Sequence, residues 1–391
     1  MSLDRVNFAQ ARYYASVALR RAERWLRRTS DTSESHGGAS FRLDKLDEKP
    51  VANVEGEIRL FISMRNELSR LPYFLSYYRA MGVGRFFFVD DRSDDGSREF
   101  ILAQNDCHVF RPTNSYRESQ FGLDWINALS DEYGIGHWTL TIDADELLVY
   151  PHCETVKLPD FCRYLEMTGS SSFFAFLLDM YPSENLSEAK CIPGKPFQQI
   201  CPYFDKDYVF KKVSEHDSET SVLPPIRVIG GPRLRKFYAW QTRTDILSRA
   251  AFAAVESIAR RLPFWREDKP HYAPSLAKVP LIKWDKGCKR ITSHLAVKPW
   301  QGQLSTVTGA LLHFKFFADF HDKAKKEVSR KQHYDGAQEY GRYLSHVRQD
   351  PDISFIYSGT RRFADSNTLV QIGLMQSDPG LEAYVQGFSG L

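Results

Sequence analysis

Two groups of acidic residues follow apolar stretches, and they are the side chains of this sequence best suited to chemistry. Asp90 and Asp91 end the segment RFFFVDD, and Asp143 and Asp145 follow the segment WTLTI. Short apolar runs of this kind predict buried strands. Because ligands bind outside the carboxyl ends of the strands in an open parallel sheet, we expect both acidic groups to meet in one crevice.

Asp143 and Asp145 have the spacing of a divalent-metal site. On an extended segment, residues i and i+2 point to the same side, so both carboxylates would face one ion. Hard oxygen ligands suit Mg²⁺ or Mn²⁺, which keep waters and substrate phosphates in their coordination shells. The alternative is a solvated acidic turn. The apolar strand argues against that alternative, because charge at the end of a buried strand is unfavourable without a partner.

The elements around these acids predict an α/β fold in which helices flank a mostly parallel sheet. Strands are expected at 57–64, 85–91, 107–112 and 137–151, and helices at 65–83, 93–104 and 117–133. Later strands are expected at 171–182, 278–284 and 309–317. Long loops are expected over 183–240, and helices at 245–262 and 319–349.

The order of the motifs resembles that of a known family. IRLFISMRNELSRLPYFLSYYRAMGVGRFFFVDDRSDDGS, followed by WTLTIDADELLVYP, resembles the bacterial glycosyltransferase family 2 group. It is also similar to a related branch, built on a domain of unknown function, that shares RNE, DDxSxDGS-type and DxDE motifs. The similarity is clear over about 57–160 and weaker through DMYP, GGPRLR and ALLHFKFF. It implies a Rossmann-like GT-A fold and a transferase that uses a nucleotide sugar.

The resemblance implies roles for the metal site. A sugar diphosphate leaves with roughly two negative charges, and a divalent ion assists its departure as a Lewis acid. Asp145 is then the direct metal ligand, Asp143 contacts the metal or the ribose, and His313 completes the shell, unless it is a core histidine. Lys315 and Arg233 are expected to bind the diphosphate, and Arg233 alternatively an anionic acceptor, since arginine suits phosphate and carboxylate geometry.

The nucleoside is expected near the first two strands. Asp91 resembles the family carboxylate that binds uracil or another base, with Asp90 as the second choice. Asp94–Ser97 are expected to form a turn and a helix cap. Met64, Arg65 and Glu67 are expected to wrap the nucleoside. Arg117 and Gln120 are expected to reach the base or a phosphate, and the alternative is that they are ordinary polar surface residues.

The catalytic base is expected among later acids. An inverting transferase needs a carboxylate that deprotonates the acceptor hydroxyl on the face opposite the leaving nucleotide. Asp179, at the end of FFAFLLD, is the first candidate, and Asp217 and Glu215 in SEHDSE are the next. The resemblance favours inversion, and the lack of a downstream ED or QxxRW motif argues against a processive synthase.

These expectations combine into a metal-dependent glycosyltransferase of cell-envelope polysaccharide synthesis. It would move a sugar from a nucleotide donor, with a UDP-sugar favoured, to a glycan or lipid-linked acceptor. One alternative is a nucleotidyltransferase, which should have a glycine-rich loop where SMRNELSRL stands. The other is a non-catalytic binding module, which should lack DxD. A net charge of +3 over 391 residues gives no support to nucleic-acid binding.

The chain divides into four predicted parts. Residues 1–28 are expected to form a basic amphipathic helix and 29–56 a flexible linker. The catalytic domain would span 57–318, with a nucleotide-binding half to residue 160 and an acceptor half after it, and 319–391 a helical extension. No apolar stretch suits a secretory signal or a membrane span. We expect a cytoplasmic protein with reduced cysteines, held at the inner face of a membrane.

Residues 1–28 predict reversible binding to anionic membranes. They carry seven arginines against two acids, together with Trp25, Tyr13 and Tyr14 as interfacial side chains. Each arginine near an anionic surface contributes about 1 kcal/mol, which salt screens. In liposome sedimentation, the full chain should pellet with anionic vesicles at low salt and be released at high salt. A chain that starts at residue 55 should stay in solution; equal behaviour of both would mean that the helix packs on its own domain or a partner.

Overall fold

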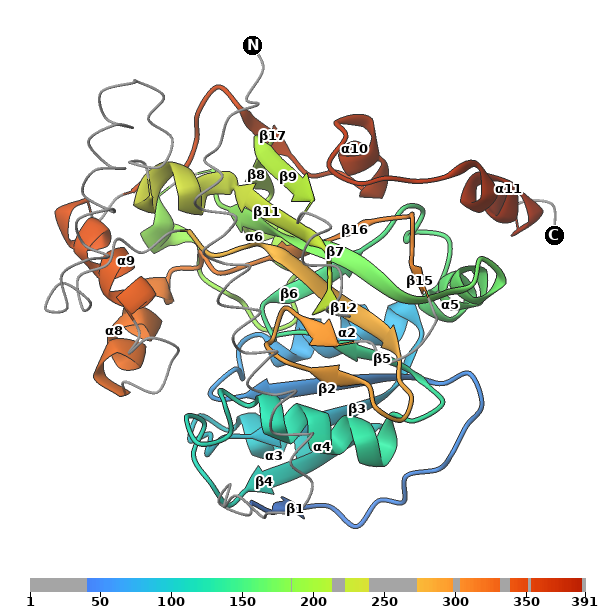
Figure 1. Ribbon diagram of the computed structural model, residues 1–391. Coiled ribbons are helices and arrows are strands. Elements are labelled where there is room, and N and C mark those ends of the chain that lie inside the picture. The colour runs from blue at the N-terminus through green and yellow to red at the C-terminus, as the bar shows by residue number, and fades with distance from the viewer. Residues whose placement is uncertain are drawn as a thin grey trace, which may run out of the picture.

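A large mixed β-sheet forms the centre of the protein (Figure 1). The computed structural model describes residues 41–183, 185–212, 222–238, 273–297, 303–330, 338–350 and 353–388. The main path of the sheet runs in the order β1-β4-β3-β2-β5-β12-β7-β16-β6. Its strands are β1 Leu43–Lys45, β2 Ile58–Met64, β3 Val83–Asp90, β4 Cys107–Pro112, β5 Trp138–Thr141, β6 Glu146–Val149, β7 Ser170–Tyr181, β12 Ala277–Lys283 and β16 Gly309–His313.

Most strands of this sheet run in one direction. β2 pairs in parallel with β3 and with β5, and β3 pairs in parallel with β4. β12 is antiparallel to both β5 and β7, so β7 and its parallel partner β16 share the direction of β5. The carboxyl ends of these parallel strands therefore lie along one edge, which we call the carboxyl edge. The α/β, Rossmann-like arrangement predicted from the sequence is confirmed at this level.

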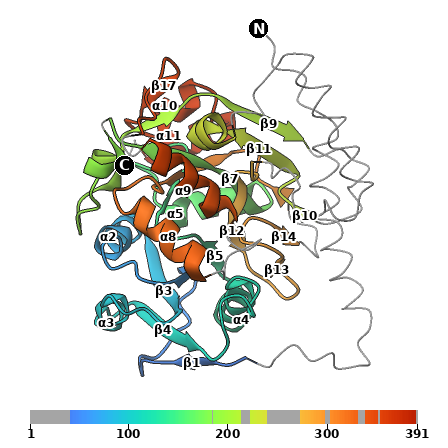
Figure 2. The ribbon, with the colours of Figure 1, turned by 90° about the vertical axis from the view of Figure 1, so that its left-hand side faces the viewer.

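Helices cover both faces of the first half of the sheet (Figure 2). Helix α2 (Leu71–Met81) and helix α3 (Ser97–Leu102) lie on one face, and α4 (Leu123–Tyr133) lies on the other. Apolar residues of α2 at helical spacing, such as Phe74 and Tyr78, are fully buried. Pro72 suits the first turn of α2, and Gly82 ends it at a φ of 95°. A side chain at Gly82 would also collide with Pro159.

The region after residue 183 is more regular than predicted. Instead of long loops, residues 203–230 contain β8 (Tyr203–Asp205), β9 (Tyr208–Lys212), β10 (Val222–Leu223) and β11 (Ile226–Gly230), and β8 pairs with β7. Proline and polar residues hide these short strands from sequence patterns. The remaining described elements are α5 Leu158–Met167, η1 Leu186–Glu188, α6 Phe197–Ile200, η3 Arg233–Phe237, β13 Lys289–Arg290, β14 Ala296–Val297, β15 Gln303–Leu304, β17 Thr360–Arg362, α10 Ser366–Gln371 and α11 Pro379–Phe388. The predicted helices at 1–28 and 245–262 lie outside the described residues.

The predicted strand at 137–151 is two strands. β5 ends at Thr141, a turn follows, and β6 begins at Glu146 at the far end of the sheet path, where it pairs with β16. The backbone N–H of Glu146 donates to the carbonyl of Asp143 and closes the turn. The acid motif is therefore a connection between two strands, and it lies at the carboxyl edge beside β5.

The predicted linker at 29–56 reaches too far toward the C-terminus. Strand β1 pairs antiparallel with β4 and forms an edge of the main sheet. Beyond it, the buried carboxylate of Asp47 accepts hydrogen bonds from the backbone of Val109 and from Lys45, and Lys49 donates to the carbonyl of Gln104. A shortened chain for the liposome experiment should therefore begin near residue 41 rather than at residue 55.

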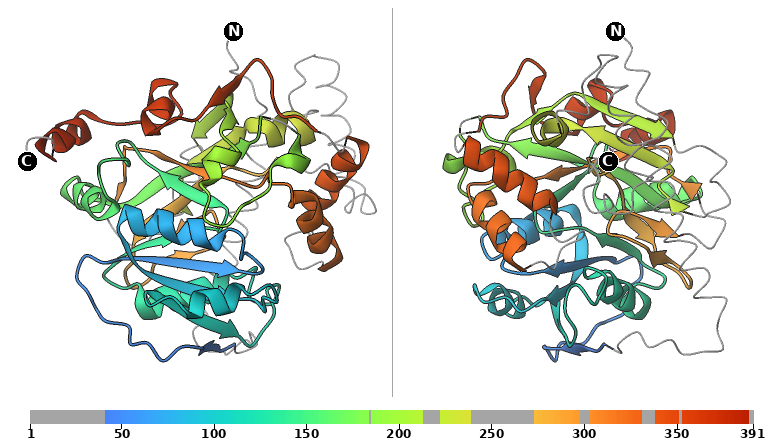
Figure 3. Two further views of the ribbon diagram at one scale, coloured as in Figure 1. Left: turned by 180° about the vertical axis from the view of Figure 1, so that it is seen from behind. Right: turned by 60° about the vertical axis from the view of Figure 1, so that its left-hand side comes forward.

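The C-terminal part packs back onto the sheet. Helix α8 (Phe320–Arg330) and helix α9 (Gln338–Gln349) replace the single predicted helix at 319–349, and they lie at the carboxyl edge, on the left in Figure 1. β17 pairs with β8, while α10 and α11 lie toward the other end of the molecule (Figure 3). The extension predicted at 319–391 thus contributes a helix directly beside the acid motif.

Asp47 should stabilise the fold in a pH-dependent way. Burial opposes its charge, but hydrogen bonds from Lys45 and the backbone of Val109 lower its pKa to about 2. Asp47→Ala should reduce the free energy of unfolding at neutral pH by about 1–3 kcal/mol, because buried donors lose their acceptor. Since the folded pKa is depressed, the difference from the unchanged protein should shrink as pH falls from about 4 to about 2.

Urea unfolding measured across this pH range tests the prediction. Asp44→Ala is the matched control, because Asp44 pairs with the largely exposed Arg42 at the protein surface. Exposed pairs contribute about 1 kcal/mol or less. An equal loss in both variants, or a difference that grows as the solution becomes more acidic, would contradict the assigned role of Asp47.

Candidate functional site

Three neighbouring strands bring charged groups into register at the carboxyl edge. In the parallel pairing of β16 with β7, His313 lies opposite Asp179. In the antiparallel pairing of β16 with β6, the same His313 lies opposite Glu146. All three residues are buried. Because Phe314 also donates its backbone N–H to the carbonyl of Asp145, the acid turn is fixed directly beside the end of β16.

Asp145 and His313 face each other across this edge. The Nε2 atom of His313 lies 3.6 Å from Oδ2 of Asp145, and the Asp145 side chain is 27% exposed. Burial raises the pKa of Asp145, but the charges of His313, Arg70 and the nearby lysines outweigh burial and hold it below its usual value. Asp145 is thus an ionised, partly accessible carboxylate with an imidazole nitrogen close by.

Asp143 does not share that partner, which corrects the expectation that both carboxylates point to one side. Its side chain is 60% exposed, and its Oδ2 atom lies 3.6 Å from Nζ of Lys278. The i and i+2 argument assumed an extended segment, whereas residues 143–146 form a turn. Lys278 also donates to both carboxylate oxygens of the buried Glu146, at 3.0 and 2.7 Å. Lys278 therefore anchors the turn at two points.

Asp179 is not placed as a general base, contrary to the first choice from the sequence. It is fully buried, and Arg233 donates to both of its oxygens at 2.7 Å. Burial alone would raise the pKa of Asp179, but Arg233 and His313 hold it well below its usual value. A carboxylate stabilised in this way is a weak proton acceptor. For the same reason Arg233, whose guanidinium engages Asp179, is not placed as the predicted diphosphate ligand.

Helix α8 brings a charged network that the sequence analysis missed. Lys323 donates to both oxygens of the predicted site residue Glu67, at 2.8 Å. Arg70 donates to both oxygens of Asp319, at 2.9 and 3.1 Å, and lies 3.3 Å from Glu67. The charges of Arg70 and Lys323 act on Asp145. In the sequence, Asp319 and Lys323 have the i, i+4 spacing of an ordinary ion pair on a helix surface. The sequence alone therefore gave no sign that α8 lies beside Glu67 and Arg70.

The C-terminal end of α8 reaches the second acidic group. Arg330 lies 2.9 Å from Oδ2 of Asp91, whose other oxygen accepts from Arg92 at 3.0 Å. The Asp91 backbone N–H donates to the carbonyl of Met64, which ties the ends of β2 and β3 together. Seven residues separate Lys323 from Arg330, about 10 Å along a helix. Helix α8 therefore passes beside both acidic groups, with Arg330 at Asp91 and the charge of Lys323 acting on Asp145.

The other predicted residues occupy varied places. Asp90 is fully buried and pairs with Arg98 at 2.6 Å, which makes it part of the β3–α3 turn. Gln120 and the exposed Arg117 lie on the loop before α4. Gln120 donates a hydrogen bond to Asp124 in the first turn of that helix. Lys315 lies two residues beyond β16, with its Nζ 4.7 Å from the ring centre of Tyr343. Arg65 is half-buried after β2, and Asp217 and Glu215 lie outside the described residues.

Asp145 and His313 together offer one carboxylate and one imidazole nitrogen to a divalent ion. Within the described residues, no group of three or more His, Cys, Asp or Glu side chains could hold a metal. Adjacent ligands about 2.1 Å from an octahedral ion lie about 3 Å apart and opposite ligands about 4.2 Å apart, so Asp145 and His313, at 3.6 Å, would move slightly closer to hold one ion as neighbouring ligands. Ions of this class accept waters and substrate phosphates in their other positions. The imidazole nitrogen favours Mn²⁺, since Mg²⁺ takes oxygen ligands.

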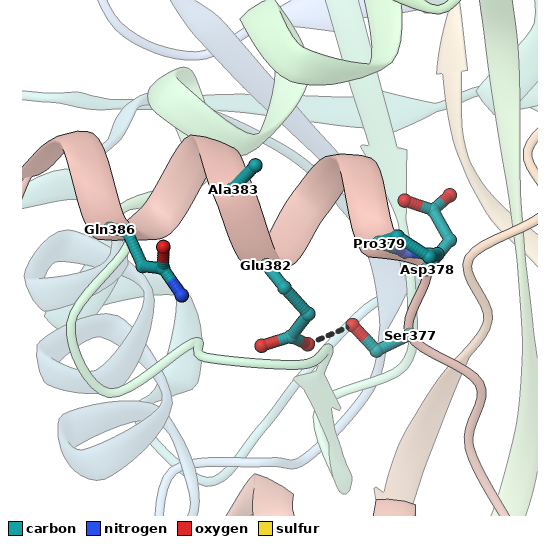
Figure 4. Close-up of a pocket in the computed structure, with 6 residues that line it drawn as sticks. All are labelled: Ser377, Asp378, Pro379, Glu382, Ala383 and Gln386. Atoms are coloured by element: carbon teal, nitrogen blue, oxygen red, sulfur yellow. Dashed lines mark hydrogen bonds between the residues drawn. The ribbon is translucent and has the colours of Figure 1, made fainter.

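A separate pocket lies on α11 (Figure 4), at the end of the molecule opposite α8 and α9 (Figure 1). Its volume is about 500 Å³, and it is lined by Ser377, Asp378, Pro379, Glu382, Ala383 and Gln386. Ser377 and Glu382 are hydrogen-bonded to each other, and Asp378 accepts from Leu381 and Thr306. These polar groups satisfy the local turn and helix start. The pocket therefore offers no cluster comparable with the carboxyl edge.

Comparison with models of known protein families gives no match, and no curated protein matches the sequence. The six cysteines, all within the described residues, form no disulfide in the structure. In the part of the chain that the structure describes, no helix has both the length and the apolar character needed to cross a membrane.

Lys278 should be essential to the stability of the acid turn. Burial raises the pKa of Glu146 to about 7, against the opposing charge of Lys278. Lys278→Met should lower the free energy of unfolding by about 3–5 kcal/mol, because it leaves a buried carboxylate without its partner. The folded variant would hold a proton that the unfolded chain releases, so its stability should fall as pH rises from about 5 to about 8.

Lys283→Met provides the matched control from the same strand. Lys283 pairs with Glu166 on the protein surface, with both side chains 41% exposed, so its loss should change the free energy of unfolding by about 1 kcal/mol or less. Chemical denaturation at several pH values compares the two variants. A Lys278→Met protein whose stability rises toward alkaline pH would contradict the proposed buried pair.

Proposed function

We propose that this protein is a metal-dependent glycosyltransferase with a GT-A fold that transfers a sugar from a nucleotide-sugar donor. The observation that carries the proposal is the pairing of Asp145, in the DxD turn, with His313 at the carboxyl edge of a Rossmann-like sheet. This edge is where open α/β sheets bind ligands. The motif resemblance described from the sequence supplies the reaction class.

In this proposal, Asp145 and His313 hold a Mn²⁺ or Mg²⁺ ion, while Asp143 lies beside Lys278 and is not a ligand of that ion. The ion, when bound, supplies Lewis-acid stabilisation of the diphosphate leaving group. Asp91 and Met64 at the ends of β3 and β2 receive the nucleoside, and UDP is the favoured nucleotide. Asp91 would then exchange an arginine partner for the base, because both of its oxygens are paired.

The acceptor is a glycan or a lipid-linked sugar in this proposal, and transfer inverts the anomeric centre. Asp179 no longer serves as the base, so Asp217 and Glu215 are the proposed candidates for deprotonating the acceptor. The protein would work in the cytoplasm at the inner face of the membrane, where nucleotide sugars are made. The DxD turn with Asp145 beside His313 favours an enzyme over a non-catalytic binding module.

A donor screen tests the proposal. Nucleotide sugars are incubated with the protein and Mn²⁺ or Mg²⁺, and release of nucleoside diphosphate is measured. Asp145→Ala and EDTA should each reduce release at least about 100-fold, because a bound metal contributes several kcal/mol to the transition state. Asp160→Ala is the matched control: its side chain is 22% exposed, close to the 27% of Asp145, and it lies on α5 away from the carboxyl edge.

Two outcomes would contradict parts of the proposal. Full turnover in EDTA would mean that cations of the protein stabilise the leaving group without a metal. Release from no donor, combined with pyrophosphate formation from a nucleoside triphosphate and a sugar phosphate, would identify a nucleotidyltransferase instead. Loss of activity in both Asp145→Ala and Asp160→Ala would point to a general loss of folding, which circular dichroism would reveal.

A further inference from the structure

Asp179 and Arg233 form a buried pair that contacts only one side of His313. Oδ1 of Asp179 lies 2.6 Å from Nδ1 of His313, while the other ring nitrogen, Nε2, faces Asp145. Arg233 holds Asp179 through two hydrogen bonds of 2.7 Å. Asp179 is fully buried and Arg233 is 5% exposed. The pair is therefore unable to reach a substrate directly, and its effect must pass through the imidazole.

The contacts determine which nitrogen of His313 carries the proton. A carboxylate accepts hydrogen bonds and does not donate them, so the 2.6 Å contact with Asp179 requires a proton on Nδ1. Arg233 also lies 3.2 Å from Nδ1, but the same nitrogen of Arg233 is closer to Asp179, at 2.7 Å. With the proton on Nδ1, Nε2 is the ring nitrogen left to bind a cation beside Asp145.

This arrangement has the form of a carboxylate that orients a metal-binding histidine from behind. In such sites the outer carboxylate fixes the tautomer and the ring orientation and raises the basicity of the ligating nitrogen. The strands impose the arrangement, since β7 and β16 place Asp179 and His313 opposite each other in the sheet. Arg233, from η3, completes it by neutralising a carboxylate that would otherwise be buried alone.

We propose that Asp179 and Arg233 are positioning residues that hold His313 in the Nδ1–H tautomer, so that Nε2 and Asp145 bind the divalent cation together. The inference rests on the metal site of the proposed function and adds two residues that act behind it. It also gives Asp179 a role in place of the general base that the sequence suggested. The two residues shape the affinity for the ion rather than the transfer of a proton from the acceptor.

The test replaces the pair as a unit. In Asp179→Asn/Arg233→Gln, the charges disappear together while the side-chain sizes stay similar, which avoids leaving one buried charge unpaired. Asp205→Asn/Arg235→Gln is the matched control, because Arg235 lies on the same η3 segment and holds the buried Asp205 through two hydrogen bonds of 3.0 Å. Among the residues that the structure describes, neither Asp205 nor Arg235 forms a hydrogen bond or ion pair with His313.

Two measurements are made on the full chain. Titration with Mn²⁺, followed by the paramagnetic resonance signal of the free ion, gives the dissociation constant. It should rise about 10–100-fold in Asp179→Asn/Arg233→Gln and stay within about twofold in the control, whose two residues make no hydrogen bond to His313 within the described part of the chain. Nitrogen-15 spectra of histidine-labelled, metal-free protein give the tautomer. His313, assigned with His313→Ala, should be the Nδ1–H form in the unchanged protein and lose that preference in the first double variant.

Every outcome decides the inference. An unchanged Mn²⁺ affinity in Asp179→Asn/Arg233→Gln, an equal loss in the control, or an Nε2–H tautomer in the unchanged protein would overturn it. Absence of Mn²⁺ binding by the unchanged protein would overturn it as well. If Mn²⁺ binding weakens as expected but no nucleotide sugar is consumed, the positioning role stands and the proposed transferase falls. If transfer occurs and the Mn²⁺ affinity is unaffected, the transferase stands and the positioning role falls.

Discussion

The need to pair buried charges governs the carboxyl edge of this protein. Asp179, Glu146 and Lys278 are almost completely buried, and an isolated charge in such a place would be strongly unfavourable. Each of them therefore meets an opposite charge within hydrogen-bond distance. The backbone register of β7, β16 and β6 places His313 between Asp179 and Glu146, and Lys278 comes from β12. The exposed acids of the turn gain their positions from this buried layer.

Sequence patterns predicted the strands and the sheet direction because apolar runs report burial. β2, β4 and β7 lie within about one residue of their expected ranges, whereas α2, α3 and α4 begin four to six residues later than expected. The apolar pattern misplaced the strand that begins with a buried charged residue. ELLV continued the apolar run of β5 in sequence, yet it pairs at the far end of the sheet path, with Glu146 held by Lys278 more than one hundred residues away. No local periodicity reports such a partner.

The sequence likewise predicted some residues of the candidate site and missed the roles or partners of others. Asp145 and His313 could be named from the sequence because a motif and a late strand pointed to them, and the structure brings them together. Asp179 and Arg233 were also named, but for roles that require access to substrate. Side-chain type could not reveal that the two residues pair with each other below the surface. Lys323 and Arg330 were missed because their acidic partners lie more than two hundred residues away.

The network around α8 bears on why the proposed reaction would use a metal. Arg70 and Lys323 act on Asp145, but they are paired with Glu67 and Asp319, so these four side chains together carry no net charge. A cation already neutralised by a carboxylate attracts a diphosphate less strongly than a separate one. Most of the positive charge that offsets the leaving group would therefore come from an ion at Asp145 and His313, with the four-residue network holding α8 against the site.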